Sequence, residues 1–219
     1  MNLDEIQRIA HASLAERSSH PWKERGNKYY HGLRTAKLTI TLRRTLFPDD
    51  MSHDDILTVA AWFHDVCNGE EDHGRKGAEE TRQRLCGLCT PKELDEICAI
   101  VLHHDDRFEE AAYLPIWTKL LQDADYLDHF GTYDIWMYFL YAGMHDGTIG
   151  DTLTYMRDER TREREYHRSG MNFELSKRIY DEKIDFFMRF CDRFAVEIDG
   201  EIWNWDNLNE SSKRSAESQ

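Results

Sequence analysis

Prolines are scarce in this sequence, and long apolar segments are absent from it. Only four prolines occur in 219 residues, so little in the chain interrupts helices. The longest apolar runs, such as 135–142, are far shorter than the roughly 20 residues that a membrane-spanning helix needs. Segment 1–10 contains Asp4, Glu5 and Arg8, unlike the basic-then-apolar order of a signal peptide. We therefore expect a cytoplasmic protein with no membrane partner.

Acidic residues outnumber basic ones, with 42 aspartates and glutamates against 28 lysines and arginines. The formal net charge of −14 argues against long nucleic acids as partners, because such binding needs a clustered basic face to neutralise phosphates. A small anionic substrate stays compatible with this charge, since a metal ion and a few cations can reverse the field inside one cleft.

The five cysteines do not form an evident disulfide or zinc framework. Cys67, Cys98 and Cys191 stand in apolar surroundings, which predicts buried, reduced thiols. Cys86 and Cys89 form a single C-x-x-C pair with no second pair of ligands. We interpret that pair as two small residues near a helix end.

Apolar residues recur with a period of about 3.6, which predicts an all-α protein. By this periodicity, helices are expected over residues 3–18, 28–46, 75–85, 116–128 and 133–142. Two further helices should follow capping boxes at 52–55 and 90–93, the first of them ending near residue 67. The second carries His104 near its end.

The C-terminal part contains the clearest helix. Its apolar residues alternate spacings of four and three and form one stripe: Tyr180, Ile184, Phe187, Cys191, Phe194 and Ile198. Segment 145–169 is polar and contains Gly147 and Gly150, so we expect a loop with irregular helix there. With no repeat or linker, residues 1–209 are predicted to be one domain, with a core over about 20–200, and 210–219 a disordered tail.

Histidine and aspartate residues fall on these helices in a pattern that predicts a metal site. His31 lies on the second helix, and His64 and Asp65 end the next one. Imidazole and carboxylate groups are natural ligands for manganese, iron, nickel, cobalt or zinc, with magnesium as a further candidate. A lone histidine such as His31 would be weak support by itself, because most such residues serve packing or solvation.

The adjacent pair His64 and Asp65 is the most specific feature. It follows a strongly apolar run, so its helix should be largely buried, and an ionised Asp65 there is costly unless it is paired or metal-bound. Neighbouring helical residues point about 100° apart, but a cation at the C-terminal end of the helix can collect both side chains. Asp123 and Asp125 compete for a further carboxylate position, and residue types alone leave that choice open.

In these residues the sequence resembles the HD superfamily of metal-dependent phosphohydrolases. That family has a histidine on one helix, an HD dipeptide on the next and a distant aspartate, here His31, His64–Asp65 and Asp125. The resemblance implies a single-domain HD-type helical bundle in which His31, His64, Asp65 and Asp125 bind a divalent metal. Because the second aspartate of the D-x-D element is the ligand in the family, Asp125 is favoured over Asp123.

The resemblance covers about 20–200 and is closest to the small stand-alone bacterial branch. Segment 119–131 is similar to the branch signature K-x-x-Q-D-A-D-R-L-D-x-x-G, and some members of the branch are regarded as nucleoside triphosphate hydrolases. A small phosphorylated substrate, in particular a nucleotide, is therefore implied. Tyr126 replaces the arginine of the signature, and Lys28 stands where an acidic residue is common. Both departures bear on the substrate more than on the metal.

Further residues are expected around the metal. The resemblance implies that His73 and one of His103 and His104 face the cleft, as catalytic or phosphate-binding groups. Charge-assisted hydrogen bonds favour Arg34 and Lys119 as phosphate contacts, with Arg75 a weaker candidate.

The expected reaction is hydrolysis by a metal-activated water, which Asp65 or Asp123 would orient. Two alternatives stay open, an HD-type di-iron oxygenase and a non-catalytic nucleotide-binding module. The sequence predicts no oligomeric state.

Overall fold

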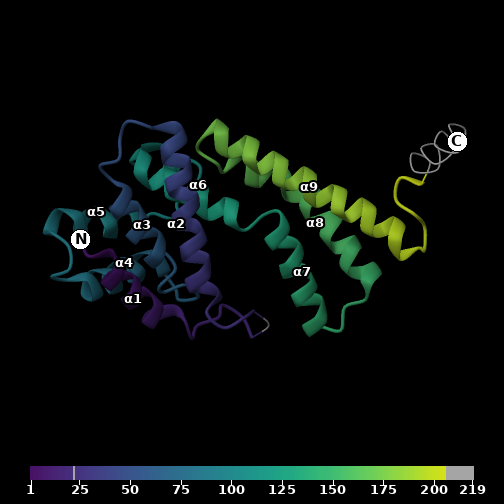
Figure 1. Ribbon diagram of the computed structural model, residues 1–219, viewed down its shortest axis with the longest axis horizontal. Helices are drawn as coiled ribbons and strands as arrows, with labels where there is room; N and C mark the ends of the chain where they lie inside the picture. The colour runs from purple at the N-terminus through teal and green to yellow at the C-terminus, as the bar shows by residue number, and fades with distance from the viewer. Residues whose placement is uncertain (22, 206–219) are drawn as a thin grey trace, which may run out of the picture.

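The computed structural model describes residues 1–21 and 23–205, and all regular elements in these ranges are helical (Figure 1). In chain order they are α1 (Leu3–Leu14), α2 (Asn27–Leu46), α3 (Asp54–Phe63), α4 (His73–Leu85), α5 (Pro91–Leu102), the short 3-10 helix η1 (Glu110–Tyr113), α6 (Ile116–Asp128), α7 (Thr132–Met144), α8 (Ile149–Ser169) and α9 (Glu174–Ile198). The prediction of an all-α, single-domain fold is confirmed.

The first six α-helices form the larger part of the molecule. Helix α2 packs against both α3 and α6, while α5 joins α3 to α4. Leu57 and Phe63 of α3 are fully buried between these helices, together with Leu120 and Leu127 of α6. Helices α2, α3 and α6 carry the residues that the sequence pattern singled out, so this packing brings them to one place.

Helices α7, α8 and α9 extend away from that part (Figure 1). They enclose a second, smaller apolar cluster: Ile135, Tyr138, Leu153, Met156, Phe187 and Cys191. The first four residues of the α9 stripe, Tyr180, Ile184, Phe187 and Cys191, are buried as predicted, whereas Phe194 is half-buried and Ile198 is exposed. The helix ends at Ile198, just before Asp199 and Gly200.

The expectation of a loop with irregular helix over 145–169 is wrong. Residues Ile149–Ser169 form one continuous helix, α8, which begins at an N-cap where Thr148 accepts a hydrogen bond from the backbone of Asp151. Few of its side chains are buried, but ion pairs tie it to α9. These pairs are Arg157–Asp192, Arg164–Asp185 and Arg168–Asp181. A largely polar helix of this kind lacks the apolar period on which the prediction relied.

Of the two predicted capping boxes, the one at Thr90 is confirmed. Its side chain accepts from the backbone of Glu93, and Glu93 accepts from the backbone of Thr90. The other is wrong, because α3 begins without a side-chain cap and Ser52 donates to Asp50 instead. Helix α1 also ends earlier than expected, at Leu14.

The predicted thiol environments agree with the structure. Cys67, Cys98 and Cys191 are buried and unpaired, whereas Cys86 is exposed and Cys89 half-buried, both as free thiols. The predicted disordered tail at 210–219 lies outside the described residues.

Candidate metal centre

Helices α2 and α3 approach each other closely beside Gly32. A Cβ atom at this position would lie 3.0 Å from the carbonyl oxygen of Ala61 and 3.3 Å from the Cα atom of Trp62. Only glycine therefore leaves the two backbones in contact without displacement. His31 precedes Gly32 on α2 and His64 directly follows α3, and their ring centroids lie 4.9 Å apart.

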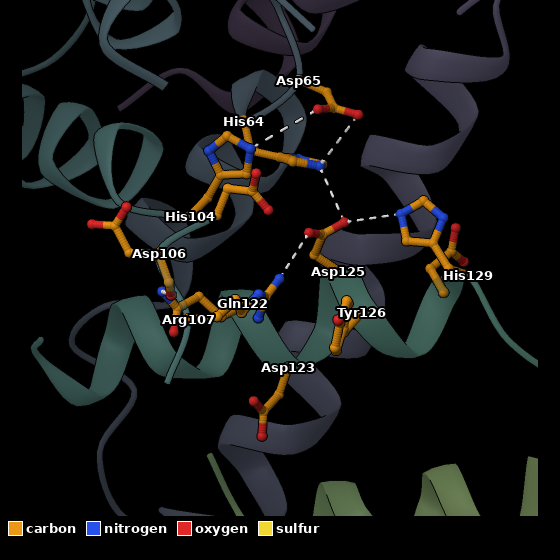
Figure 2. A network of polar contacts seen from close by, with 12 residues as sticks. His64, Asp65, His104, Asp106, Arg107, Gln122, Asp123, Asp125, Tyr126 and His129 are labelled. Atoms are coloured by element: carbon orange, nitrogen blue, oxygen red, sulfur yellow. Dashed lines mark hydrogen bonds and ion pairs between the residues drawn. The ribbon is translucent and has the colours of Figure 1, made fainter. Parts of the chain in front are cut away.

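Donor atoms from three segments converge at this point (Figure 2). Nε2 of His31 lies 3.1 Å from Nε2 of His64 and 3.0 Å from Oδ1 of Asp125. Nε2 of His64 lies 3.5 Å from the same carboxylate oxygen. Oδ2 of Asp65 is 3.8 Å from both imidazole nitrogens. The structure thus brings His31, His64, Asp65 and Asp125 together, and all four are buried.

The outer nitrogens of the two imidazoles are already engaged. Nδ1 of His64 lies 2.8 Å from the carbonyl oxygen of Ala61, which can only accept, so this nitrogen donates. Nδ1 of His31 lies 2.7 Å from Oδ2 of Asp128. In the neutral rings both Nε2 atoms then carry lone pairs that face each other. Such an arrangement requires a proton or a cation between them, and a metal ion fits this donor set.

Charge also accumulates at this point. Burial disfavours the charged form of His31, but the carboxylates of Asp125 and Asp128 outweigh it and raise the pKa of His31 to about 9. Burial likewise opposes ionisation of Asp65, yet the nearby His64, Lys28 and His31 lower its pKa. The pKa of Asp125 is also well below its usual value, because contacts with histidines overcome its burial. Ionised carboxylates therefore surround a position suited to a cation.

A second donor group shares Asp65. Ligand atoms of Asp65, His73 and His104 all lie within 4.8 Å of one another. His104 is buried, and its Nδ1 lies 2.7 Å from the carbonyl oxygen of Val101, so its Nε2 is left as an acceptor. His73, at the start of α4, is half-buried. Asp65 thus faces the first group with one oxygen and His104 with the other.

Residues 29–129 match the HD domain family. This part of the chain is similar to an HD domain. The matched range includes all four residues of the first donor group, His31, His64, Asp65 and Asp125.

The fold of the chain is similar to that of solved structures. An HD-superfamily hydrolase from Bacillus thuringiensis has 20% identity and a TM-score of 0.64, over 92% of this chain and 100% of that one. YpgQ from Bacillus subtilis has 20% identity and a TM-score of 0.62, over 89% and 94%. The complex of YpgQ with ADP has 21% identity and a TM-score of 0.61, over 88% and 97%. These likenesses show a shared fold.

No curated protein matches the sequence. Across the described parts of the chain, no helix has both the length and the apolar character needed to cross a lipid bilayer.

Several residues predicted for this site lie outside both donor groups. His103 points away and contacts Asp106 at 2.7 Å, with 39% of its side chain exposed. Asp123 faces the opposite side of α6 from Asp125 (Figure 2). Its carboxylate accepts hydrogen bonds from the backbone nitrogens of Asn172 and Phe173, and it therefore supports the start of α9.

The two predicted phosphate contacts are also engaged with protein groups. Lys119 donates to the carbonyl oxygen of Ala112. Arg34 forms a two-pronged contact with Asp128, at 2.8 Å through Nε and 2.8 Å through Nη2. Because Asp128 also contacts His31, Arg34 is linked to the donor group through the carboxylate that holds this imidazole.

Sequence reasoning missed three residues beside the donor atoms. Asp128 and His129 follow Asp125 by three and four residues on α6, a spacing that places them on one helix face and could have revealed them. Arg107 comes from the loop between α5 and η1, with its Nη2 3.3 Å from Oδ2 of Asp125. A loop has no periodicity, so no comparable signal marked Arg107.

Proposed function

We propose that this protein is a metal-dependent phosphohydrolase acting on a nucleotide or another small phosphate ester or anhydride. The observation that carries the proposal is the pair of imidazole acceptors, His31 and His64, whose Nε2 atoms lie 3.1 Å apart beside Asp65 and Asp125. These four residues are the proposed metal ligands. Nitrogen and oxygen donors of this kind suit manganese, iron, nickel, cobalt or zinc, and magnesium is a further candidate.

A bound divalent metal supplies a water of lowered pKa and polarises a phosphoryl oxygen. Residues of the chain would orient the reactants. Oδ1 of Asp65 accepts from the side-chain amide of Asn68 at 3.0 Å and lies 4.0 Å from Nε2 of His104. In this proposal it also accepts a hydrogen bond from the attacking water and so fixes its direction.

His73 and His104 are the proposed phosphate-facing histidines. Burial lowers the pKa of His104, with further lowering by His64, so its ring is held neutral. His73 lies beside it, with ring centroids 5.1 Å apart, and is the more accessible of the two. Their place next to Asp65 supports a role in contacting the group that is hydrolysed.

The nucleotide class is supported by the related fold of Bacillus subtilis YpgQ, which has been solved with ADP. An alternative is a di-iron oxygenase, which the shared position of Asp65 between two donor groups favours. The two functions differ in what they consume, because an oxygenase takes up oxygen and a phosphohydrolase releases phosphate or pyrophosphate.

The test is elemental analysis of the purified protein, followed by a screen of phosphoryl compounds with added manganese, cobalt, nickel or magnesium. His64→Ala and Asp125→Ala should lose both metal and hydrolysis while retaining helical circular dichroism. His145→Ala is the matched control, because His145 is exposed at the end of α7.

Each other outcome has a defined meaning. Full hydrolysis by metal-free His64→Ala would overturn the proposal. Bound iron with substrate-dependent oxygen uptake and no phosphate release would establish the oxygenase instead. Tight nucleotide binding without turnover in the presence of any of these metals would favour a non-catalytic nucleotide-binding module.

A further inference from the structure

Arg107 is a buried cation whose hydrogen-bonding capacity is largely unused. Its side chain is 10% exposed, and Nη2 makes the contact with Asp125. Nε and Nη1 are buried and have no partner among the described residues. Leaving charged donors buried and unsatisfied is costly, so this guanidinium is suited to receive an anion.

The plane of the guanidinium is held by an aromatic ring. The Cζ atom of Arg107 lies 4.3 Å from the ring centroid of Tyr126, and the Tyr126 hydroxyl lies 2.9 Å from Nδ1 of His167 on α8. Figure 2 shows the side chain of Arg107 reaching toward the carboxylate of Asp125. The guanidinium of Arg107, which comes from a loop, therefore lies over the ring of Tyr126 on α6.

Exposed aromatic rings continue from this position to the surface. Phe108 and Tyr166 have ring centroids 5.1 Å apart and are 42% and 59% exposed. A Cβ atom at Gly170 would lie 3.3 Å from Cε1 of Tyr126 and 3.5 Å from Cζ of Phe108. The rings of Tyr126 and Phe108 therefore both pack on Gly170.

The backbone of Phe108 has an unusual conformation. Its φ of 57° is in the left-handed region, which bulky residues rarely adopt. Strained backbone positions of this kind cluster at ligand sites, and Phe108 directly follows the buried, unsatisfied Arg107.

We propose that Arg107 binds a phosphate group of the substrate and that Phe108 and Tyr166 bind its base by stacking. This subsite rests on the proposed hydrolase function and narrows its substrate class to nucleotides. Each base presents an aromatic face to such rings, so the subsite recognises the presence of a base more than its identity. Arg107 also contacts Asp125, so the bound phosphate is placed beside the proposed metal ligands.

The test compares ATP with inorganic tripolyphosphate, which has the same phosphate chain and no base. Phe108→Ala and Tyr166→Ala should each raise KM for ATP roughly tenfold and leave tripolyphosphate hydrolysis unchanged. Arg107→Ala should weaken both substrates by roughly 10- to 100-fold, because it removes charge-assisted hydrogen bonds to phosphate. Arg107→Lys keeps the charge but not the forked pair of donors. Its loss for both substrates should therefore lie between those of wild type and Arg107→Ala.

Tyr155→Ala is the control for Tyr166→Ala, because Tyr155 is also an exposed tyrosine on α8, with 51% exposure. Phe108→Leu keeps apolar packing on Gly170 without the aromatic face, and thermal unfolding of each variant separates loss of fold from loss of stacking. Parallel losses for ATP and tripolyphosphate in the Phe108 and Tyr166 variants would overturn the base subsite, as would no loss for either.

Equilibrium binding of ATP separates this inference from the hydrolase proposal. The wild-type protein could hydrolyse neither compound while Phe108→Leu or Arg107→Ala binds ATP more weakly than wild type does. That result would support the subsite and contradict the hydrolase proposal. The wild-type protein could instead hydrolyse tripolyphosphate and bind ATP no more tightly than tripolyphosphate. That result would agree with the hydrolase proposal and overturn the base subsite.

Discussion

The ammonium nitrogen of Lys28 lies 2.5 Å from Oδ2 of Asp65, the carboxylate oxygen that faces His31 and His64. A positive charge is therefore paired with a proposed metal ligand and competes with a cation for it. We predict that Lys28→Met tightens divalent metal binding by about tenfold, because the competing pair and its repulsion are removed. Calorimetric titration with manganese measures the change.

Lys37→Met is the control for this prediction, since Lys37 is an exposed lysine on the same helix. Weaker metal binding by Lys28→Met would show that Lys28 holds Asp65 in place instead of competing for it.

The close approach at Gly32 makes a prediction about stability. Gly32→Ala should lower the free energy of unfolding by about 1–3 kcal/mol and weaken metal binding, because the added methyl group separates α2 from α3. Gly143→Ala, on α7, meets nothing within 4 Å and should be neutral or stabilising by up to about 1 kcal/mol. Urea unfolding measures both variants, and equal effects at the two positions would contradict the prediction.

Asp128 should tune the metal without binding it. Asp128→Asn keeps the shape of the side chain but has only one oxygen to offer His31 and Arg34 together. We expect metal affinity to fall by roughly 10- to 100-fold, as is typical when the partner of a ligating histidine is lost. Asp192→Asn, which alters an exposed ion pair with Arg157, should leave the affinity unchanged.

The buried carboxyl of Asp134 should make the free energy of unfolding depend on pH, independently of the proposed metal site. Burial raises its pKa to about 6, despite the ion pair with Arg160. Between about pH 4 and pH 6, the folded state therefore binds a proton that the unfolded chain releases, and this contribution to stability is lost as pH rises. At about 1.4 kcal/mol per pKa unit, the stability of wild type relative to Asp134→Asn should fall by up to about 3 kcal/mol across that window.

Denaturant unfolding of both proteins at several pH values measures this difference. A constant difference from pH 4 to pH 6 would show that Asp134 stays ionised throughout.

Residue type and helical setting pointed to residues that the structure brings together. His64 and Asp65 end a strongly apolar helix, and the structure buries both beside His31 and Asp125. Which of His103 and His104 faces the site was harder to predict from the sequence. His103 and His104 are adjacent at the end of α5, where the exact last turn decides which ring faces inward. The structure buries His104 and leaves His103 beside Asp106.

Features that depend on distant partners escaped the sequence. Helix α8 is held by pairs such as Arg164 with Asp185, and no local period reveals such partners. Arg107 lies in a loop, and its place above Tyr126 follows from the packing of α6 against segments near Gly170. In both cases tertiary contacts supply what local propensity does not.

The ionic contacts between α8 and α9 carry a consequence for ionic strength. They lie at the surface, where dissolved salt screens charges over about 10 Å at 0.1 M. Helix α8 also holds Tyr166 beside Phe108 and His167 beside Tyr126. The donor atoms of the metal centre are buried and belong to other helices, so they are shielded from the same screening. Rising salt should therefore weaken the proposed base subsite more than the proposed cation site.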